Sequence, residues 1–343
     1  MAKNKSKIVY LCSSCGADFP KWHGQCPACN EWGTLGEFKV SNTRSSKLNA
    51  EKKETHTLES ILHKEEVKRI SIGIKEVDRV LGGGVLSGSM ILLGGSPGIG
   101  KSTLALQTLS SFKQNVLYAS AEESEEQIAL RAKRLNVLSS NIHLSSENRI
   151  DEILSQVTLL KPQLLIIDSI QTIFNENLDS LPGSVSQIRE CGQKLLQLAK
   201  DESIAIIVIG HVTKEGVIAG PKMLEHMVDT VLYLEGDERN DHRILRSVKN
   251  RFGTTNEVGI FQMTTLGLEE VKNPSELFLA ERRNDITGST IFPSLEGTRP
   301  ILVEIQSLVS NANFSAPQRN VNGFDFKRLS MLLAVLEKRM GYK

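Results

Sequence analysis

The chain has 343 residues, 40% of them apolar and 24% charged, a composition typical of a globular protein. This length predicts two or three domains. No apolar run approaches the roughly 18 residues of a membrane span and no signal peptide is recognisable, so we expect a cytoplasmic protein with no membrane partner. The net charge of +1 excludes a uniformly basic nucleic-acid coat, although residues 1–57 carry nine Lys or Arg against five Asp or Glu.

The first chemical motif is a set of four cysteines in two C-x-x-C pairs. They are Cys12, Cys15, Cys26 and Cys29. Two such pairs can hold one Zn²⁺ tetrahedrally, and four protein ligands leave no position open for catalysis, so the zinc is expected to be structural. Disulfides and a redox C-x-x-C are the competing interpretations, which a reducing cytosol disfavours. We predict a zinc finger over residues 1–38, with Trp22 and Trp32 covering its small core.

Residues 39–58 are polar and show almost no apolar periodicity, which predicts a flexible linker. A globular pattern begins near Ile61. Within it, residues 70–84 predict a short helix closed by three consecutive glycines.

An apolar strand at residues 91–95 runs directly into the spacing G-x-x-x-x-G-K-S, which begins at Gly95. Glycines let backbone N–H groups surround phosphate oxygens, Lys101 can reach the β- and γ-phosphates, and the Ser102 hydroxyl can ligate Mg²⁺. A helix beginning near residue 101 adds its positive end to the same place. The expected ATP-binding residues are Gly95, Ser96, Pro97, Gly98, Ile99, Gly100, Lys101, Ser102 and Thr103.

Strands and helices alternate after this P-loop, which predicts an α/β fold with a mostly parallel sheet. The expected strands are 91–95, 115–120, 164–168 and 204–210, and the expected helices are 102–112, 124–135, 149–160 and 185–201. Segments 228–235 and 243–249 predict an antiparallel hairpin at one edge. Cys191, inside a predicted helix, is interpreted as a small buried residue.

Hydrolysis needs a metal anchor and a group that orients water. Asp168 ends an apolar strand, the position of a Walker B aspartate that would help hold Mg²⁺; the alternative is a helix cap. Glu122, or else Glu123, ends the strand after the P-loop helix and is predicted to activate water. Both glutamates also suit the first turn of a helix. His211, at the end of another strand, is either a γ-phosphate sensor or a structural residue.

The pattern changes after residue 283. Residues 285–310 contain Gly, Pro and Thr and end in a β-like run at 300–309, and residues 324–340 predict an amphipathic helix. Its apolar face comprises Phe326, Leu329, Leu332, Leu333, Leu336 and Met340. So short a segment makes a poor independent core.

Together, these motifs resemble the bacterial RadA (Sms) family of RecA-related DNA repair ATPases. The features that carry the resemblance are the four-cysteine finger, residues 69–84, the P-loop at 94–103, Ala121-Glu-Glu-Ser124 and Lys249-Asn-Arg-Phe-Gly253. The resemblance covers essentially the whole chain. It implies a RecA-like ATPase domain at 59–283 that forms a homohexameric ring, binds single-stranded and branched DNA and promotes branch migration. The RecA recombinase is an implied partner.

The resemblance also implies roles for individual residues. Lys249 and Arg251 follow the predicted edge hairpin and could act as fingers on a neighbouring subunit's ATP; otherwise they are solvated turn cations. Residues 213–222 match the position of the DNA-binding loop of RecA-like proteins, with Lys214 and Lys222 as phosphate contacts. This loop has no aromatic residue, so binding should be indifferent to sequence.

In the family, the ATPase core is followed by a domain that resembles the Lon protease but lacks its peptidase activity. Residues 284–343 match only the start of such a domain. In the family this domain contributes to DNA binding and ring assembly, so the partial match affects the expectation of both. The same residues offer no assignable Ser–Lys pair for a peptidase. The alternative function is a KaiC-like P-loop switch or phosphotransfer protein that does not act on DNA.

Overall fold

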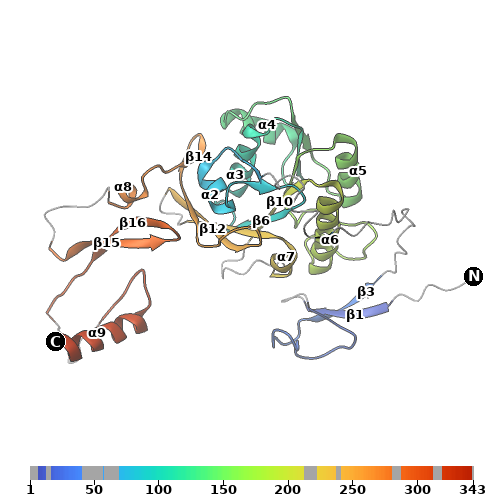
Figure 1. Ribbon diagram of the computed structural model, residues 1–343. Helices are drawn as coiled ribbons and strands as arrows, with labels where there is room; N and C mark the ends of the chain where they lie inside the picture. Colours follow the sequence, from blue (N-terminus) through green and yellow to red (C-terminus); the bar gives the residue numbers. More distant parts are fainter. Residues whose placement is uncertain are drawn as a thin grey trace, which may run out of the picture.

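The main body is one sheet with helices on both faces (Figure 1). The computed structural model describes residues 7–12, 17–40, 57, 69–211, 222–236, 241–279, 287–311 and 319–341. In spatial order, the strands of the sheet are β14 (Gly267–Glu270), β13 (Val258–Thr264), β12 (His242–Asn250), β11 (Thr230–Glu235), β6 (Met90–Gly95), β10 (Ala205–His211), β9 (Leu164–Asp168), β7 (Val116–Ser120) and β8 (Ile142–Ser145). Pairing is parallel from β11 to β8 and antiparallel from β11 to β14.

The central strands are apolar on both faces because both faces are covered. Side chains alternate strictly: Leu164 and Ile166 of β9 join one buried cluster, whereas Leu165 and Ile167 join the other. The first cluster is completed by α2 (Lys75–Leu81), α3 (Lys101–Thr108) and α4 (Glu125–Arg134). The second is completed by α5 (Ile150–Leu160), α6 (Val185–Glu202) and α7 (Lys222–Met227).

Local sequence fixes the ends of two helices near the site. Ser124 accepts from the backbone N–H of Gln127, whose side chain accepts from the Ser124 N–H, so a capping box starts α4. Gly82, at φ +79°, ends α2 in the left-handed conformation that glycine adopts without steric cost. The predicted glycine-closed helix before the P-loop is therefore confirmed.

The predicted strands and helices are all present, with shifts of a few residues at their ends. The helix expected at 102–112 ends at Thr108 and continues as a short 3₁₀ turn, η1 (Leu109–Ser111). Cys191 is fully buried within α6, as expected. The predicted hairpin forms as β11 and β12, but its placement at an edge was wrong, because β13 and β14 extend the sheet beyond it.

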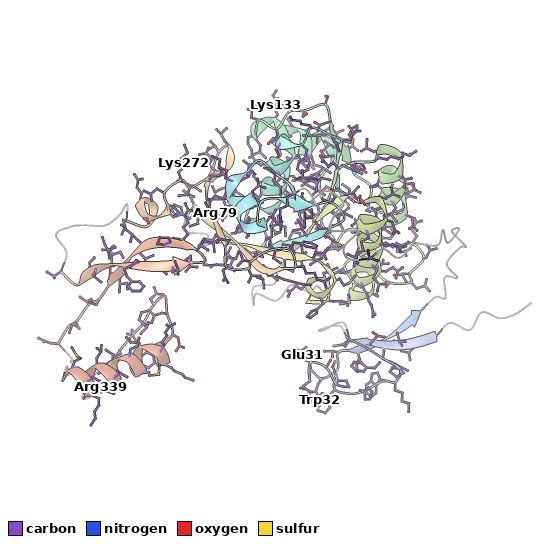
Figure 2. The ribbon with its side chains drawn as sticks, in the orientation of Figure 1. Glu31, Trp32, Arg79, Lys133, Lys272 and Arg339 are labelled. Carbon is purple, nitrogen blue, oxygen red and sulfur yellow. The ribbon has the colours of Figure 1, made fainter. Side chains whose placement is uncertain are left out.

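The N-terminal residues form a separate small sheet in the order β2 (Asp18–Phe19), β1 (Lys7–Cys12) and β3 (Leu35–Val40). Cys12, Cys26 and Leu35 form its core. Trp22 and Trp32 are 60% and 75% exposed, so the expectation that they cover this core was wrong. Figure 2 shows Trp32 beside Glu31 on this small module.

A two-stranded sheet, β4 (Arg69–Ile70) with β5 (Val85–Leu86), lies between the N-terminal module and the P-loop in the sequence. After α8 (Pro274–Leu279) comes an antiparallel hairpin of β15 (Ser289–Glu296) and β16 (Arg299–Gln306). Ion pairs tie this hairpin to the main body: Arg299 contacts Glu76 of α2, and Glu296 contacts Arg246 of β12.

The predicted C-terminal helix is α9 (Phe326–Met340), and none of its residues is buried. Its predicted apolar face therefore has no cover among the described residues. None of the helices in the described part of the chain is long and apolar enough to cross a membrane.

Candidate functional site

Four parallel strands, β6, β7, β9 and β10, end at one edge of the sheet. The register pairs Ser120 with Asp168 and His211 with Gly95, so the residues that follow these strand ends are gathered together. In an open α/β sheet, the carboxyl ends of the strands form the usual ligand-binding edge. The structure therefore brings together four segments that the sequence places up to about 115 residues apart.

The P-loop connects β6 to α3 through a turn that depends on glycine. Gly98 and Gly100 have φ angles of +75° and +111°. A Cβ on Gly100 would lie 2.6 Å from Cε of Met263 on β13, whereas a Cβ on Gly98 would meet nothing within 4 Å. Met263, on the antiparallel part of the sheet, thus packs closely against Gly100, whereas Gly98 borders open space.

Lys101 begins α3 and its side chain is nearly buried, at 4% exposure. Its Nζ donates to the carbonyl oxygens of Gly95 and Ser96, at 2.9 Å each. Burial lowers the pKa of Lys101, and the nearby carboxylates of Asp168 and Glu122 oppose that shift. The ammonium is thus held inside the loop, where it can interact with a phosphate.

Asp168 ends β9 on the face of the sheet that carries α3, because side chains of the same face recur every second residue. Its Oδ2 accepts a 2.5 Å hydrogen bond from the Tyr118 hydroxyl. Its buried Oδ1 has no hydrogen-bonding partner among the described residues. A buried carboxylate oxygen without a partner is costly, and a bound cation would satisfy it. The residues present therefore fit a magnesium site.

The two candidate glutamates have different surroundings. Oε1 of Glu122 accepts from the Ser169 hydroxyl at 2.6 Å and lies 3.1 Å from Nε2 of His211. The hydrogen bond with His211 is the main cause of the lowered pKa of Glu122, which keeps the carboxylate ionised. Glu123 instead forms an ion pair with Arg131 of α4. Glu122 therefore faces Ser169, directly after β9, and His211, the last residue of β10, whereas Glu123 pairs with a residue of α4.

The structure does not bring Lys249 and Arg251 to this edge. Lys249 lies inside β12, opposite Val231, which pairs with Leu92 three residues before Gly95. With about 3.3 Å per strand residue, Lys249 and Arg251 lie roughly 10–17 Å back along the strands from the chain's own P-loop. The expectation that they follow an edge strand was wrong, since β13 pairs with β12 at residues 242–246.

Lys249 has a structural role within the subunit. Its Nζ donates to the carbonyl oxygens of Glu225, His226 and Val228, where α7 ends. A lysine that caps the last carbonyls of a helix also complements the helix dipole. The Arg251 side chain is 54% exposed, with its Nη1 3.6 Å from Oδ1 of the buried Asp229.

The cysteine motif forms a candidate metal centre. Among the described residues, the sulfurs of Cys12, Cys26 and Cys29 all lie within 4.8 Å of one another. The Sγ atoms of Cys12 and Cys29 are 3.7 Å apart. Tetrahedral zinc with Zn–S bonds of about 2.3 Å requires sulfurs about 3.8 Å apart, so the spacing fits zinc. Cys15, the predicted fourth ligand, lies outside the described residues.

The predicted DNA-contact segment, residues 213–222, lies almost wholly outside the described residues, including Lys214. Lys222 is the first residue of α7, and the position of its side chain is not described.

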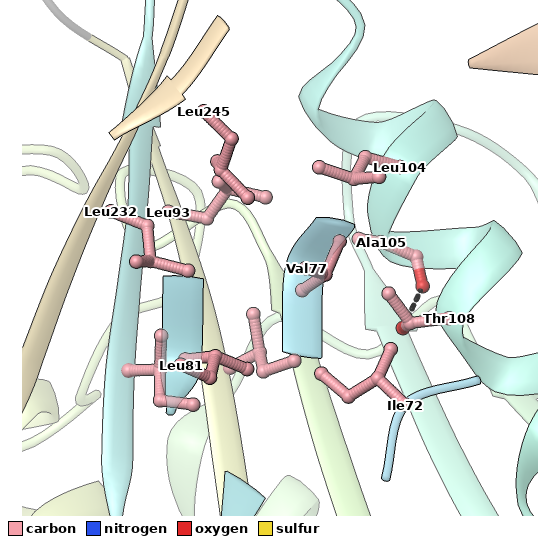
Figure 3. A pocket seen from close by; sticks show the side chains of 11 residues that line it. Ile72, Val77, Leu81, Leu93, Leu104, Ala105, Thr108, Leu232 and Leu245 are labelled. Atoms are coloured by element: carbon pink, nitrogen blue, oxygen red, sulfur yellow. Dashed lines mark hydrogen bonds between the residues drawn. The ribbon is translucent and has the colours of Figure 1, made fainter. Parts of the chain in front are cut away.

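An apolar cavity of about 20 Å³ lies away from the site, between α2, α3 and the strands beneath them (Figure 3). Thr108 is its one polar lining residue, and its hydroxyl donates to the Ala105 carbonyl at 2.6 Å. A bound water needs two to four polar partners, which this lining does not offer. The cavity is therefore a packing void and not a ligand site.

Sequence reasoning missed Tyr118, Ser169 and Gln171. Tyr118 stands in the middle of an apolar strand, where an aromatic residue is usually core. Gln171 is also at the site: its amide atoms have no partner among the described residues, and its Nε2 would lie 3.9 Å from a Cβ on Gly210. One signal was available for Tyr118, since a buried tyrosine hydroxyl usually needs a hydrogen-bonding partner.

Comparisons with known proteins show which families this chain resembles. Residues 10–37 match the rubredoxin metal binding domain, and residues 69–257 match a family of unknown function, DUF7125. The chain is 49% identical to the DNA repair protein RadA of Bacillus subtilis over 99% of its own length and 76% of that protein. It is 52% identical to RadA of Chlamydia pneumoniae, over 99% of this chain and 75% of that protein.

A solved structure, the KaiC-like protein PH0186 of Pyrococcus horikoshii, matches with a TM-score of 0.50 at 21% identity. The match covers 60% of this chain and 100% of that one. At this identity, the likeness concerns the fold alone. It supports the predicted α/β core with its mostly parallel sheet.

Proposed function

Because the chain belongs to the bacterial RadA family of DNA repair proteins, we propose that it is an ATPase whose hydrolysis of ATP is stimulated by single-stranded DNA. The observation that carries the proposal is the convergence of Lys101, Asp168 and Glu122 at one sheet edge. The P-loop N–H groups and Lys101 bind the phosphates, with Gly95, Ser96, Pro97, Gly98, Ile99, Gly100, Ser102 and Thr103 forming the rest of the ATP site. Ser102 and Asp168 would hold the magnesium ion.

Magnesium would neutralise charge on the phosphate oxygens when bound. Glu122 orients the attacking water as a hydrogen-bond acceptor, because its carboxylate is ionised at neutral pH and lies beside the P-loop lysine. Ser169 and His211 hold its carboxylate in one orientation.

The proposal includes a second subunit at each site, as part of a homohexamer. Lys249 and Arg251 lie too far from their own P-loop to contact the same nucleotide, so they can reach ATP only in a neighbouring copy. The exposed Arg251 guanidinium is suited to this role, and Lys249 would have to leave the carbonyls of α7.

Within this proposal, single-stranded and branched DNA are the macromolecular substrates, with Lys214 and Lys222 contacting phosphates and branch migration as the outcome. The RecA recombinase is the proposed partner. The division into a zinc finger (1–38), a linker (39–58), an ATPase domain (59–283) and the start of a Lon-like domain (284–343) belongs to the same proposal.

The deciding experiment measures ATP hydrolysis with and without single-stranded DNA. We expect stimulation in the wild type, its loss in Lys101→Ala, and no change in Lys113→Ala, which removes an exposed lysine of the same domain. A wild type that hydrolyses ATP without any response to DNA would refute the DNA-dependent function and favour the KaiC-like switch.

Subunit mixing tests the fingers. Lys101→Ala and Lys249→Ala are each expected to be inactive, yet a mixture should regain activity, because about one quarter of randomly formed interfaces join an intact P-loop to an intact finger. Melting curves control for the loss of the α7 cap. An inactive mixture that still assembles would remove the trans role from Lys249.

A further inference from the structure

We propose that Tyr118 is a positioning residue, which holds the Asp168 carboxylate so that one of its oxygens stays available to magnesium. The inference rests on the nucleotide site proposed above. It assigns a function to a buried side chain that contacts neither nucleotide nor water in that proposal.

The position of Tyr118 follows from strand register. β7 pairs in parallel with β9, and Tyr118 lies opposite Ile166, so Asp168 is the next residue of β9 on the same face. Such diagonal neighbours are separated by roughly 7–8 Å, a gap that an aromatic side chain can span. Tyr118 is fully buried within the apolar cluster beneath α3, which fixes the direction of its ring.

The hydrogen bonds divide the two oxygens of the Asp168 carboxylate. The Tyr118 hydroxyl donates to Oδ2 at 2.5 Å, while the buried Oδ1 has no partner among the described residues. The phenol therefore occupies one carboxylate oxygen and leaves the other available to a cation.

This arrangement restricts rotation of the carboxylate. Because Oδ2 is hydrogen-bonded to a rigid donor, the carboxylate group cannot rotate freely, and Oδ1 keeps one position. Partners that orient a metal ligand in this way typically change metal affinity or activity by 10–100-fold when they are removed. The alternative is purely structural: the phenol is buried and Asp168 merely satisfies it. The two alternatives predict different magnesium affinities for the site once the Tyr118 hydroxyl is removed.

The test is Tyr118→Phe, which keeps the ring and removes only the hydroxyl. Two quantities are measured with a fluorescent ATP analogue: its affinity in EDTA, and the magnesium concentration that half-saturates the metal-dependent change in binding. We expect unchanged affinity in EDTA and a half-saturating magnesium concentration raised about tenfold or more. The matched control is Tyr233→Phe, which removes a hydroxyl bonded to Glu225 in the same sheet, and it should leave both quantities unchanged.

A double-mutant cycle isolates the partner. In an Asp168→Asn background, Tyr118→Phe should cause no further change in the magnesium requirement. An unchanged magnesium requirement in the single variant would overturn the proposal. Loss of binding in EDTA as well would also overturn it, because the hydroxyl would then support the fold of the pocket in general. If the wild type itself binds no nucleotide, the proposed ATPase function fails instead.

Discussion

Lys101→Met should separate nucleotide binding from folding. The substitution keeps an unbranched side chain of similar length but removes the nearly buried ammonium group. It deletes two charge-assisted hydrogen bonds, each worth about 1.5–3 kcal/mol, to the carbonyls of Gly95 and Ser96. It also removes the attraction of the ammonium to the Asp168 and Glu122 carboxylates and the desolvation penalty of a buried ion. That penalty is several kcal/mol and outweighs the attraction, because the pKa of Lys101 is lowered overall. Because these contributions nearly cancel, we expect the free energy of unfolding without nucleotide to stay within about 1 kcal/mol of wild type, or to rise.

Ligand linkage gives the second half of the prediction. A non-hydrolysable ATP analogue at 100 times its dissociation constant stabilises the wild type by about 2.7 kcal/mol. At about 2–4 °C per kcal/mol for a domain of this size, the melting temperature rises by roughly 5–11 °C. Lys101→Met should lose this rise. Differential scanning fluorimetry with and without Mg²⁺ and the analogue measures both quantities, and Lys113→Met is the exposed matched control.

The pH dependence has a defined sign. Since burial lowers the pKa of Lys101 in the folded chain, the unfolded chain binds more protons between that lowered pKa and the ordinary lysine pKa of 10.5. The charge penalty is fully present below the lowered pKa and disappears as pH rises through this window. The wild type should therefore gain stability relative to Lys101→Met as pH increases there. A variant that melts far below wild type without nucleotide, or that keeps the full nucleotide-induced rise, would refute this reasoning.

Three further predictions follow from described contacts. Gly100→Ala should destabilise the chain by more than 1 kcal/mol and weaken nucleotide binding, because Gly100 has a φ of +111°, which an alanine adopts only with strain, and the added Cβ would also displace the end of the Met263 side chain. Gly98→Ala is the control, because its φ of +75° lies closer to the left-handed helical region and its Cβ would meet nothing within 4 Å, so denaturant titration should show a smaller loss. Arg299→Met should cost about 3 kcal/mol in the same titration, because it removes the main partner of the buried Glu76, and adding Glu76→Gln should recover much of that loss. Chelation should release one zinc per chain in a colorimetric assay and leave the melting of the ATPase body unchanged, whereas a substoichiometric yield from fully loaded protein would count against the centre.

The candidate nucleotide-binding edge of the sheet could be predicted because its signals are local in sequence. An apolar strand followed by the P-loop, and an apolar strand ended by Asp168, each define a position without knowledge of the rest of the chain. Parallel pairing then brings the strand ends together. The choice between Glu122 and Glu123 was not local: it depends on Ser169 and His211 on one side and Arg131 on the other.

The antiparallel extension escaped prediction for a physical reason. β13 contains Gly259, which usually weakens a strand. In the folded chain, a Cβ at this position would lie 2.8 Å from the Glu76 carbonyl, so the glycine permits close approach of α2. Tyr118 escaped for a related reason, since its partner lies 50 residues away and only strand register makes them neighbours.

Lys249 and the P-loop of the same chain lie at different places along the strands, so each copy of the chain has two different edges through which it could contact another copy. A contact that joins the nucleotide edge of one copy to the opposite edge of the next is head-to-tail, and such contacts make a ring if the rotation closes and a helical filament if it does not. If Lys249 acts on the nucleotide of a neighbouring copy, as proposed above, a closed ring has as many complete nucleotide sites as subunits, whereas an open row has one fewer. Counting active sites per chain would therefore report on closure of the assembly.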